Sequence, residues 1–457
     1  MKSVVPKSTT AQPETSESKA EIKITNRFYF SNLSKYSLRY SILANDKVLK
    51  SEQLNLNLAP QESQIVTIPI QKLIGKEGVE YFINFEVKTL VPEQLIPVGH
   101  VIAYDQFQLP LQKEKYEYVA KGEKLLVSET TDSVSIKSSK VFFSFNKKTG
   151  IATSYRINGR EYFQNGFGIQ PNYWRAPNDN DYGNGAPKRL QVWKQESKNF
   201  SIKSTKVENL GNTVQLTVSY QLTIGNTNSI TYTLYPDGAL NVRSDFNKTN
   251  IAQTPELPRL GVRFRLPASL DNIQYFGRGP VENYIDRFRG TLVGLYKSKA
   301  NDLYFPYVRP QENGHHIDTR WLTLTEQKGS GLLILANKTI GFNALRNSVE
   351  DFDSEEAKQH DYQWQNYSPE EIANKDPEKA KNVLRRMHHT NDIVPRNFVE
   401  VCVDMKQQGV GGFDSWGART QEGFTIPANL NYEWSFTLIP INNTTQINFY
   451  LPYKFEE

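Results

Sequence analysis

Strict alternation of apolar and polar residues is the feature that most limits how this chain can fold. Between Thr213 and Ile224 every second side chain is apolar and the residues between them are polar. A period of two places the apolar side chains on one face of a half-buried antiparallel strand. Gly225-Asn226 and Pro236-Asp237-Gly238 supply turn residues, and the alternation resumes after each. The stretch therefore predicts a three-stranded meander.

Short strand-like segments also fill the chain before this meander. About seven of them occur in roughly the first 100 residues, beginning with 22–30, which is typical of an immunoglobulin-like sandwich. The charged segment 110–124 is the expected linker. The first residues are polar and lack the apolar core of a signal peptide. We therefore expect a polar tail over 1–20, an immunoglobulin-like domain over 21–115 and a large β-sandwich domain over 116–457.

Helix signals are few and occur late in the chain. Ser368-Pro369-Glu370-Glu371 combines a capping box with Pro at the first helical position. Asp376-Pro377 offers another helix start, and 354–360 predicts one or two turns. The chain shows no regular alternation of strands and helices, which a TIM barrel requires. The expected fold class is all-β: an immunoglobulin-like sandwich followed by a large antiparallel β-sandwich, without a TIM barrel.

Charge, cysteine content and hydropathy exclude several classes of protein. There are 54 Lys and Arg against 49 Asp and Glu, and an excess of +5 over 457 residues does not indicate a nucleic-acid binder. The lone Cys402 excludes an internal disulfide and a multi-cysteine metal site. No apolar run is long enough to cross a membrane. We expect a cytoplasmic location, or a periplasmic one if a longer parent chain carries a leader.

Two kinds of motif raise the question of metal binding. Asn178–Gly183 resembles part of a calcium loop, but Tyr182 and Arg189 occupy positions where ligands are required. A hydrogen-bonded, Asx-rich loop is the favoured interpretation. His315-His316 and His388-His389 are adjacent pairs, and neighbouring residues of a strand point to opposite faces. We therefore predict no metal site and no cofactor in this chain.

Four carboxylates in one region are candidates for general acid–base chemistry. They are Glu282, Asp286, Glu312 and Asp318. Four arginines lie near them in sequence and would hold these acids ionised. They are Arg278, Arg287, Arg309 and Arg320. A structural network of salt bridges and caps is therefore favoured over a catalytic pair.

A glycine-rich loop is the most suggestive motif for binding. Gly409–Gly417 contains four glycines, which allow close backbone approach, and it carries Trp416. An indole face can stack on the apolar face of a sugar ring. The alternative is an indole that packs back onto its own domain, as most large aromatic side chains do.

Four collinear motifs carry a resemblance to a known family. They are 171–183 (PNYWRAPNDNDYG), 275–287 (YFGRGPVENYIDR), 307–314 (YVRPQENG) and the glycine loop 409–417. Together with 22–28, they resemble the C-terminal part of the large bacterial β-galactosidases of glycoside hydrolase family 2. The resemblance implies the family's second immunoglobulin-like domain followed by its small-chain domain. That last domain is a supersandwich similar in architecture to the mutarotases.

The resemblance also implies where the chemistry resides. The family retains configuration by means of two glutamates on a TIM barrel, which also carries its magnesium ligands. The family's acid/base residue follows an Asn, and no Asn of this chain is followed by Glu. The resemblance therefore implies no catalytic residue here, and a chain that is inactive by itself.

One position of the family's active site does match this chain. An aromatic residue of the final domain's glycine loop forms the platform for the aglycone sugar, such as the glucose of lactose. The match is Trp416, with Asp414 as weaker support for the loop. Further matches resemble framework residues. They are Arg175, Asp179, Asp181, Glu282, Arg309 and Glu312.

The expected function is that of a non-catalytic C-terminal portion or small subunit of a β-galactosidase. It would complete the galactoside pocket of a catalytic barrel or large subunit, without a nucleic-acid or membrane partner. One alternative is a stand-alone carbohydrate-binding module. Another is a mutarotase-like enzyme that recruits His316 or His389 together with Glu312.

Overall fold

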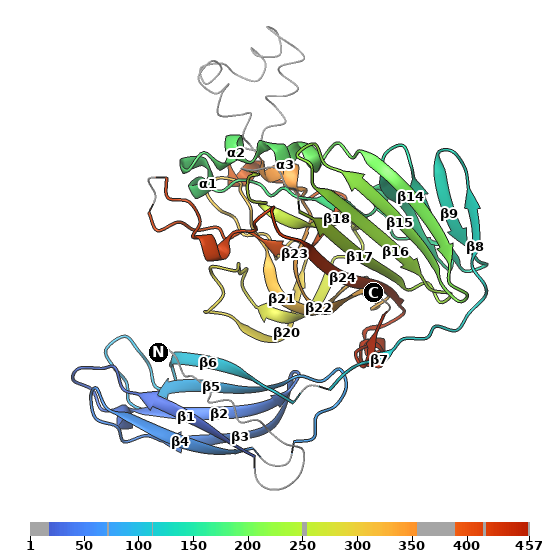
Figure 1. The fold of residues 1–457 in the computed structure, drawn as a ribbon. Coiled ribbons are helices and arrows are strands. Elements are labelled where there is room, and N and C mark those ends of the chain that lie inside the picture. Colours follow the sequence, from blue (N-terminus) through green and yellow to red (C-terminus); the bar gives the residue numbers. More distant parts are fainter. Residues whose placement is uncertain are drawn as a thin grey trace. The chain divides into compact units, whose positions relative to one another are not determined.

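The computed structural model describes residues 18–70, 73–111, 113–248, 254–353, 389–414 and 417–455. The helices predicted within 354–388 lie outside the described residues. The chain divides into two compact units (Figure 1). One contains the described residues up to Tyr116 together with Tyr450–Tyr453, and the other contains Glu117–Phe449 and the chain from Lys454. No helix in the described ranges is both long and apolar enough to span a membrane.

The first unit is a β-sandwich of one two-stranded and one four-stranded antiparallel sheet. β1 (Ser18–Thr25) pairs with β4 (Ser63–Ile70). The larger sheet has the order β3-β2-β5-β6. Its strands are β2 (Tyr36–Ala44), β3 (Lys47–Asn55), β5 (Tyr81–Thr89) and β6 (Val101–Leu109), and η1 (Leu33–Lys35) precedes β2. Ile24 and Ile68 of the small sheet share one buried core with Tyr40 and Ile83 of the large sheet.

The second unit is built around a twelve-stranded antiparallel sheet. Its main path is β13-β18-β23-β22-β24-β17-β16-β15-β14, while β21 pairs with β22 and β19, and β19 pairs with β20. The strands are β13 (Gln170–Asn172), β14 (Ile202–Asn209), β15 (Val214–Gln221), β16 (Thr227–Leu234), β17 (Leu240–Asn247), β18 (Arg259–Pro267), β19 (Asn272–Gly279), β20 (Leu292–Lys299), β21 (His316–Thr325), β22 (Gly331–Leu345), β23 (Phe398–Gln407) and β24 (Tyr432–Ile441).

A five-stranded sheet covers part of this large sheet. Its order is β12-β11-β10-β9-β8. The strands are β8 (Leu126–Glu129), β9 (Ser133–Lys137), β10 (Val141–Asn146), β11 (Ile151–Ile157) and β12 (Arg160–Glu161). Phe143 of β10 packs on Tyr232 of β16, with ring centroids 5.4 Å apart, inside one core that both sheets share. The second unit is therefore also a sandwich, and the expected all-β class is confirmed.

The predicted meander corresponds to β15, β16 and β17. Leu216 pairs with Tyr232, which pairs in turn with Val242, and all three side chains are buried. The burial of β15 alternates residue by residue, as the period-two pattern requires. A final two-stranded sheet joins β7 (Tyr116–Glu117) to β25 (Tyr453–Lys454).

Short helices occupy connections between these strands. The α-helices among the described residues are α1 (Asp179–Gly183), α2 (Ala186–Arg189), α3 (Gln191–Glu196), α4 (Val349–Phe352) and α8 (Ile447–Tyr450). The 3-10 helices are η2 (Gln164–Gly166), η3 (Thr390–Asp392), η4 (Glu422–Phe424) and η5 (Thr444–Gln446). The Asx-rich segment expected as a loop begins α1 instead. Asn178 caps this helix in a reciprocal capping box with Asp181, so its Asx hydrogen bonds serve a helix N-terminus.

Candidate functional site

The glycine loop is the place where motifs distant in sequence meet. β23 ends at Gln407, and the loop begins two residues later at Gly409. Segments from near α1 and from the turn that contains Asp286 contact its first three residues. Figure 1 shows α1 and the connection after β23 on the same side of the second unit. We take this loop and its anchors as the candidate site.

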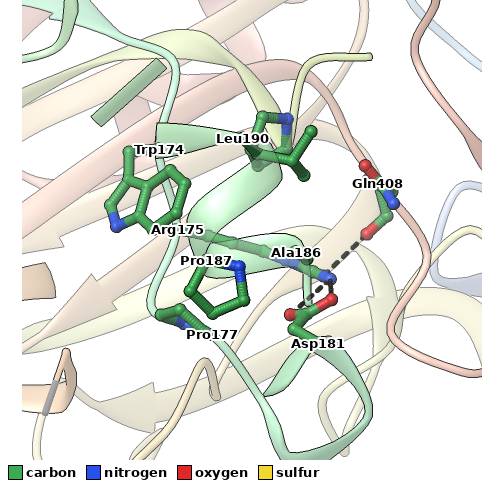
Figure 2. A pocket seen from close by; sticks show the side chains of 9 residues that line it. Trp174, Arg175, Pro177, Asp181, Ala186, Pro187, Leu190 and Gln408 are labelled. Carbon is green, nitrogen blue, oxygen red and sulfur yellow. Dashed lines mark hydrogen bonds and ion pairs between the residues drawn. The ribbon is translucent and has the colours of Figure 1, made fainter. Parts of the chain in front are cut away.

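A buried guanidinium fixes the backbone where the loop begins. Arg175 donates to the carbonyl oxygens of Gln408 at 2.8 Å and of Gly409 at 3.1 Å. It also pairs with Asp181 at 3.0 Å, and both side chains are buried. Figure 2 shows Arg175 between Asp181 and Gln408. Because a charge-assisted network keeps the buried ions satisfied, this pair is a rigid base for the loop.

Two amides of the Asx-rich segment hold the next loop residue. Asn178 Nδ2 and Asn180 Nδ2 both donate to the carbonyl oxygen of Val410, at 2.9 and 3.2 Å. Asn178 Oδ1 accepts from the Asp181 backbone N–H. These polar groups therefore serve the loop and the helix cap. Across the part of the chain that the structure describes, no group of three or more His, Cys, Asp or Glu side chains could hold a metal.

The turn that follows β19 supplies a third anchor. Asp286 Oδ2 accepts from the Gly411 backbone N–H at 2.8 Å. A Cβ atom on Gly409 would lie 2.6 Å from this same oxygen, so the close approach requires glycine there. Gly417 has a backbone φ of +120°, a value that residues other than glycine rarely adopt. The close contact at Gly409 and the backbone angle at Gly417 explain two of the four glycines in the loop.

The tip of the loop carries the predicted site residues. Trp416 lies outside the described residues, and so does Ser415. Asp414 Oδ1 accepts from the Ala418 backbone N–H at 3.1 Å, so it joins the two sides of the tip. Phe413 is 79% exposed. The stacking role of Trp416 and the supporting role of Asp414 stay predictions.

The four candidate carboxylates have separate partners and do not form a pair. Glu282 accepts from Arg287, from the Tyr307 hydroxyl and from the Gly314 N–H. Asp318 pairs with Arg278 at 2.5 Å, and Asp286 is bonded to the loop. Glu282 and Asp318 therefore pair with arginines that are their neighbours in sequence, whereas Asp286 bonds the loop backbone instead. The framework pair of Asp179 and Arg309 also forms, at 3.0 Å.

Glu312 belongs to a buried network that sequence reasoning missed. Arg259 donates to Glu312 at 3.2 Å, to Asn343 at 2.8 Å and to Gln407 at 2.6 Å. Its Nε also pairs with Asp404 at 3.2 Å. The only sequence signal was charged residues within otherwise apolar strands, such as Asp404 in the run VEVCVDM. Because the partners of these charged residues come from other strands, they could not be identified from the sequence.

Burial sets the protonation of this network. Burial raises the pKa of Asp404 to about 7, against the opposing effect of Arg259. Burial lowers the pKa of His315 well below its ordinary value, and Arg259 adds to this effect. One cation therefore faces two carboxylates. Burial, with a smaller effect of Glu312, disfavours the charged form of Asp404 and raises its pKa toward neutral pH.

The first histidine pair lies in the core of the second unit. His315 Nδ1 lies 2.8 Å from Asn343 Oδ1. The His316 ring packs against Tyr275, with centroids 4.9 Å apart, and burial lowers its pKa to about 4. His389 is exposed and precedes η3, while its neighbour His388 lies outside the described residues. Both members of the first pair are therefore core residues.

Cavities near these groups are small. One, of about 10 Å³, lies beside Arg175, Asp181 and Gln408 (Figure 2). Another, of about 20 Å³, adjoins Arg259 and Glu312. Each has room for about one water, whereas a small-molecule pocket measures about 300 Å³ or more. Neither cavity can hold a sugar ring.

Two family models and several β-galactosidases match the sequence of this chain. Residues 137–438 match the family described as Beta galactosidase small chain, and residues 22–110 match Beta-galactosidase, domain 4. A β-galactosidase of Priestia megaterium is 30% identical over 428 residues, which cover 93% of this chain and 38% of that protein. A β-galactosidase of Streptococcus thermophilus is 25% identical and is covered to 37%. This chain thus spans under two fifths of the length of these relatives.

Solved structures similar to this chain include a galactose mutarotase related enzyme from Lactobacillus acidophilus. It is 7% identical, with a TM-score of 0.36. The similarity covers 68% of this chain and 98% of that structure.

Proposed function

Because the chain belongs to the β-galactosidase family through its small-chain region, we propose that it completes the sugar pocket of a β-galactosidase without performing catalysis. It would present Trp416 to the aglycone sugar, while a catalytic barrel or large subunit would supply the chemistry. The observation that carries this proposal is the anchoring of the glycine loop. Arg175, Asn178 and Asp286 hold its first three residues by separate hydrogen bonds.

Anchoring matters because a stacking platform must be held in place before the sugar arrives. A pre-organised loop avoids the entropy cost of ordering on binding. The anchors end at Gly411, and Asp414 closes the tip against Ala418. Trp416 therefore follows a fixed base by a few residues only, in a loop that already exposes another aromatic side chain, Phe413.

The carboxylates support the assignment of catalysis to another part of the enzyme. A retaining glycosidase needs two carboxyl groups about 5–5.5 Å apart that flank an open sugar site. Glu282, Asp286 and Asp318 have separate protein partners, and Glu312 lies inside the sandwich. The resemblance implies that the family's magnesium ligands lie on the barrel, and we propose the same assignment here.

The first test compares two substrates in the complex with the catalytic part. Replacing Trp416 with Ala removes the stacking surface, worth about 1 kcal/mol, so KM for lactose should rise about fivefold. A nitrophenyl galactoside lacks the second sugar, and its KM should change much less. The matched control is Trp416→Phe, which retains a ring. Equal changes for both substrates would refute the platform role.

A second test uses the purified chain alone. It should not hydrolyse a nitrophenyl β-galactoside above background, because its carboxylates are engaged in structural contacts. Sustained hydrolysis that copurifies with the chain would contradict the proposal and return attention to Glu282, Glu312 and Asp318.

The same preparation distinguishes the alternatives. The exposed Phe413 is the observation that favours a stand-alone carbohydrate-binding module, which would bind lactose in a calorimeter without the catalytic part. A mutarotase-like enzyme would accelerate the mutarotation of galactose in a polarimeter. We expect no lactose binding by the chain alone, because neither cavity can hold a sugar ring. We expect no mutarotation, because Glu312 is bonded to Arg259 and Asn343 in the interior.

A further inference from the structure

The tip of the glycine loop presents an aromatic side chain to solvent. Phe413 is 79% exposed, although the three residues at the base of the same loop are hydrogen-bonded to the rest of the unit. A phenyl ring gains free energy when it leaves water, so an exposed ring on an anchored loop is costly unless something binds it. A single exposed apolar residue is ordinary on a protein surface, and the case for Phe413 therefore depends on how its backbone is held.

Contacts on both sides of Phe413 hold that backbone. A Cβ atom on Gly412 would lie 2.5 Å from the Ala418 carbonyl oxygen, so the two arms of the tip meet there without room for a side chain. Asp414 Oδ1 accepts from the Ala418 backbone N–H at 3.1 Å. The residues before and after Phe413 therefore both contact the opposite arm, while the ring between them stays in solvent.

An exposed ring on a fixed backbone suits a sugar as its ligand. The apolar face of a pyranose stacks on an aromatic ring, and a side chain that is already placed loses little freedom when the sugar binds. Sugar hydroxyls also require donors and acceptors beside the apolar surface. Asp414 and Arg419 are both exposed and add a carboxylate and a guanidinium next to the two ends of this contact.

The place of Phe413 in the loop indicates which part of a substrate it would meet. In the proposed function galactose faces the catalytic part and Trp416 receives the first sugar of the aglycone. Phe413 precedes Trp416 by three residues, a length of at most about 11 Å of chain. Two linked sugars span a comparable length, so the next sugar of a longer aglycone is the unit that this ring can reach.

We propose that Phe413 is a specificity-determining residue that stacks on the second sugar of the aglycone, which makes galactosides of oligosaccharides the preferred substrate class. This proposal rests on the proposed function. The cavities near the base of the loop each hold about one water, so a longer aglycone would lie on the open surface of the tip and not in an enclosed pocket. An open surface sets no limit on the length of the sugar chain.

The test compares lactose with galactosyl-cellobiose, which extends lactose by one glucose, in the complex with the catalytic part. The parent complex should have a KM about fivefold lower for the trisaccharide, and Phe413→Ala should abolish this difference while it changes KM for lactose by less than about twofold. Phe413→Tyr retains the ring and should behave as the parent. Phe413→Leu retains apolar bulk without a ring and should behave as Phe413→Ala. Because the side chain is exposed, all three variants should keep the melting temperature of the parent.

Three results would overturn the proposal. The first is an equal KM for both sugars in the parent complex, and the second is a trisaccharide preference that Phe413→Leu retains. The third is weaker assembly of Phe413→Ala in sedimentation velocity, with KM raised equally for both sugars, which would make Phe413 a contact with the catalytic part.

The proposed function can fail separately. If Trp416→Ala leaves KM for lactose unchanged, the platform role of Trp416 is refuted. If Trp416→Ala raises KM for lactose but the trisaccharide gains nothing from Phe413, the platform stands and only the assignment of Phe413 is refuted.

Discussion

Replacing Asp404 with Asn should alter the pH dependence of folding stability in a defined direction. Asp404 pairs with Arg259, which Glu312 also contacts, so one cation serves two buried carboxylates. Burial raises the pKa of Asp404 from 3.8 to about 7 in the folded protein. Asn resembles the protonated acid in shape and charge, but it cannot titrate.

The sign follows from proton linkage. Because the folded state holds this proton more tightly than the unfolded state, Asp404 contributes stability that is complete below pH 4 and is lost as pH rises to about 7. Three pKa units at 1.36 kcal/mol each give an upper limit of about 4 kcal/mol. The free energy of unfolding of the Asn variant, relative to the parent, should therefore rise with pH by up to this amount and level off above pH 7.

The parent and the variant must be compared because two histidines change the free energy of unfolding with pH in the opposite direction to Asp404. Burial lowers the pKa values of His315 and His316, so their contribution falls as pH drops below about 6.5. Both proteins contain these histidines. Although His315 Nδ1 lies 3.8 Å from Asp404 Oδ2, burial lowers the pKa of each histidine far enough to keep both rings neutral in the folded state over the range measured, so the difference between the proteins removes this effect.

The measurement is urea denaturation at intervals from pH 4.5 to 8.5, followed by near-ultraviolet circular dichroism. Asp132→Asn serves as the control, since Asp132 forms an exposed pair with Lys148. The control should show no pH-dependent difference from the parent. If the Asp404→Asn difference stays constant within about 1 kcal/mol over this range, or falls as pH rises, the reasoning about the buried carboxylate is refuted.

Two further predictions concern the base of the glycine loop. Arg175→Met should lower the free energy of unfolding by about 3–5 kcal/mol, because it leaves a buried carboxylate unpaired. Arg309→Met should cost about 1 kcal/mol or less in the same urea titration, because its partner Asp179 is exposed. Gly409→Ala should cost about 1–3 kcal/mol and speed proteolysis of the loop, because its methyl group would meet Asp286. The control Gly423→Ala has open space and should be neutral, so equal proteolysis rates would contradict the requirement for glycine at 409.

Much of the fold could be predicted because β-strand patterning is a local property. The alternation of 213–224 is present in neighbouring residues, and the turns that follow it are marked by their own residue types. The structure pairs Leu216 with Tyr232 as that pattern requires. The helix α1 was missed because Asn178 and Asp181 are equally suited to a turn and to a helix cap.

The candidate site could be predicted as a set of motifs but not as a set of contacts. Sequence alone placed Glu312 near Arg309, whereas its partner in the structure is Arg259, more than 50 residues earlier. Arg175 likewise meets Gln408, over 230 residues later. Such pairs depend on which strands are adjacent, and the sequence pattern does not give that order.

The sequence by itself determined the strands, their buried faces and the family. Side-chain alternation and collinear motifs can be recognised without knowledge of the tertiary contacts. The tertiary structure alone decided which charges are buried together, that burial raises the pKa of Asp404, and how the glycine loop is anchored. The physical reason is that ionisation and anchoring depend on the distance and burial of groups on different strands. Those quantities exist only after the sheets have assembled.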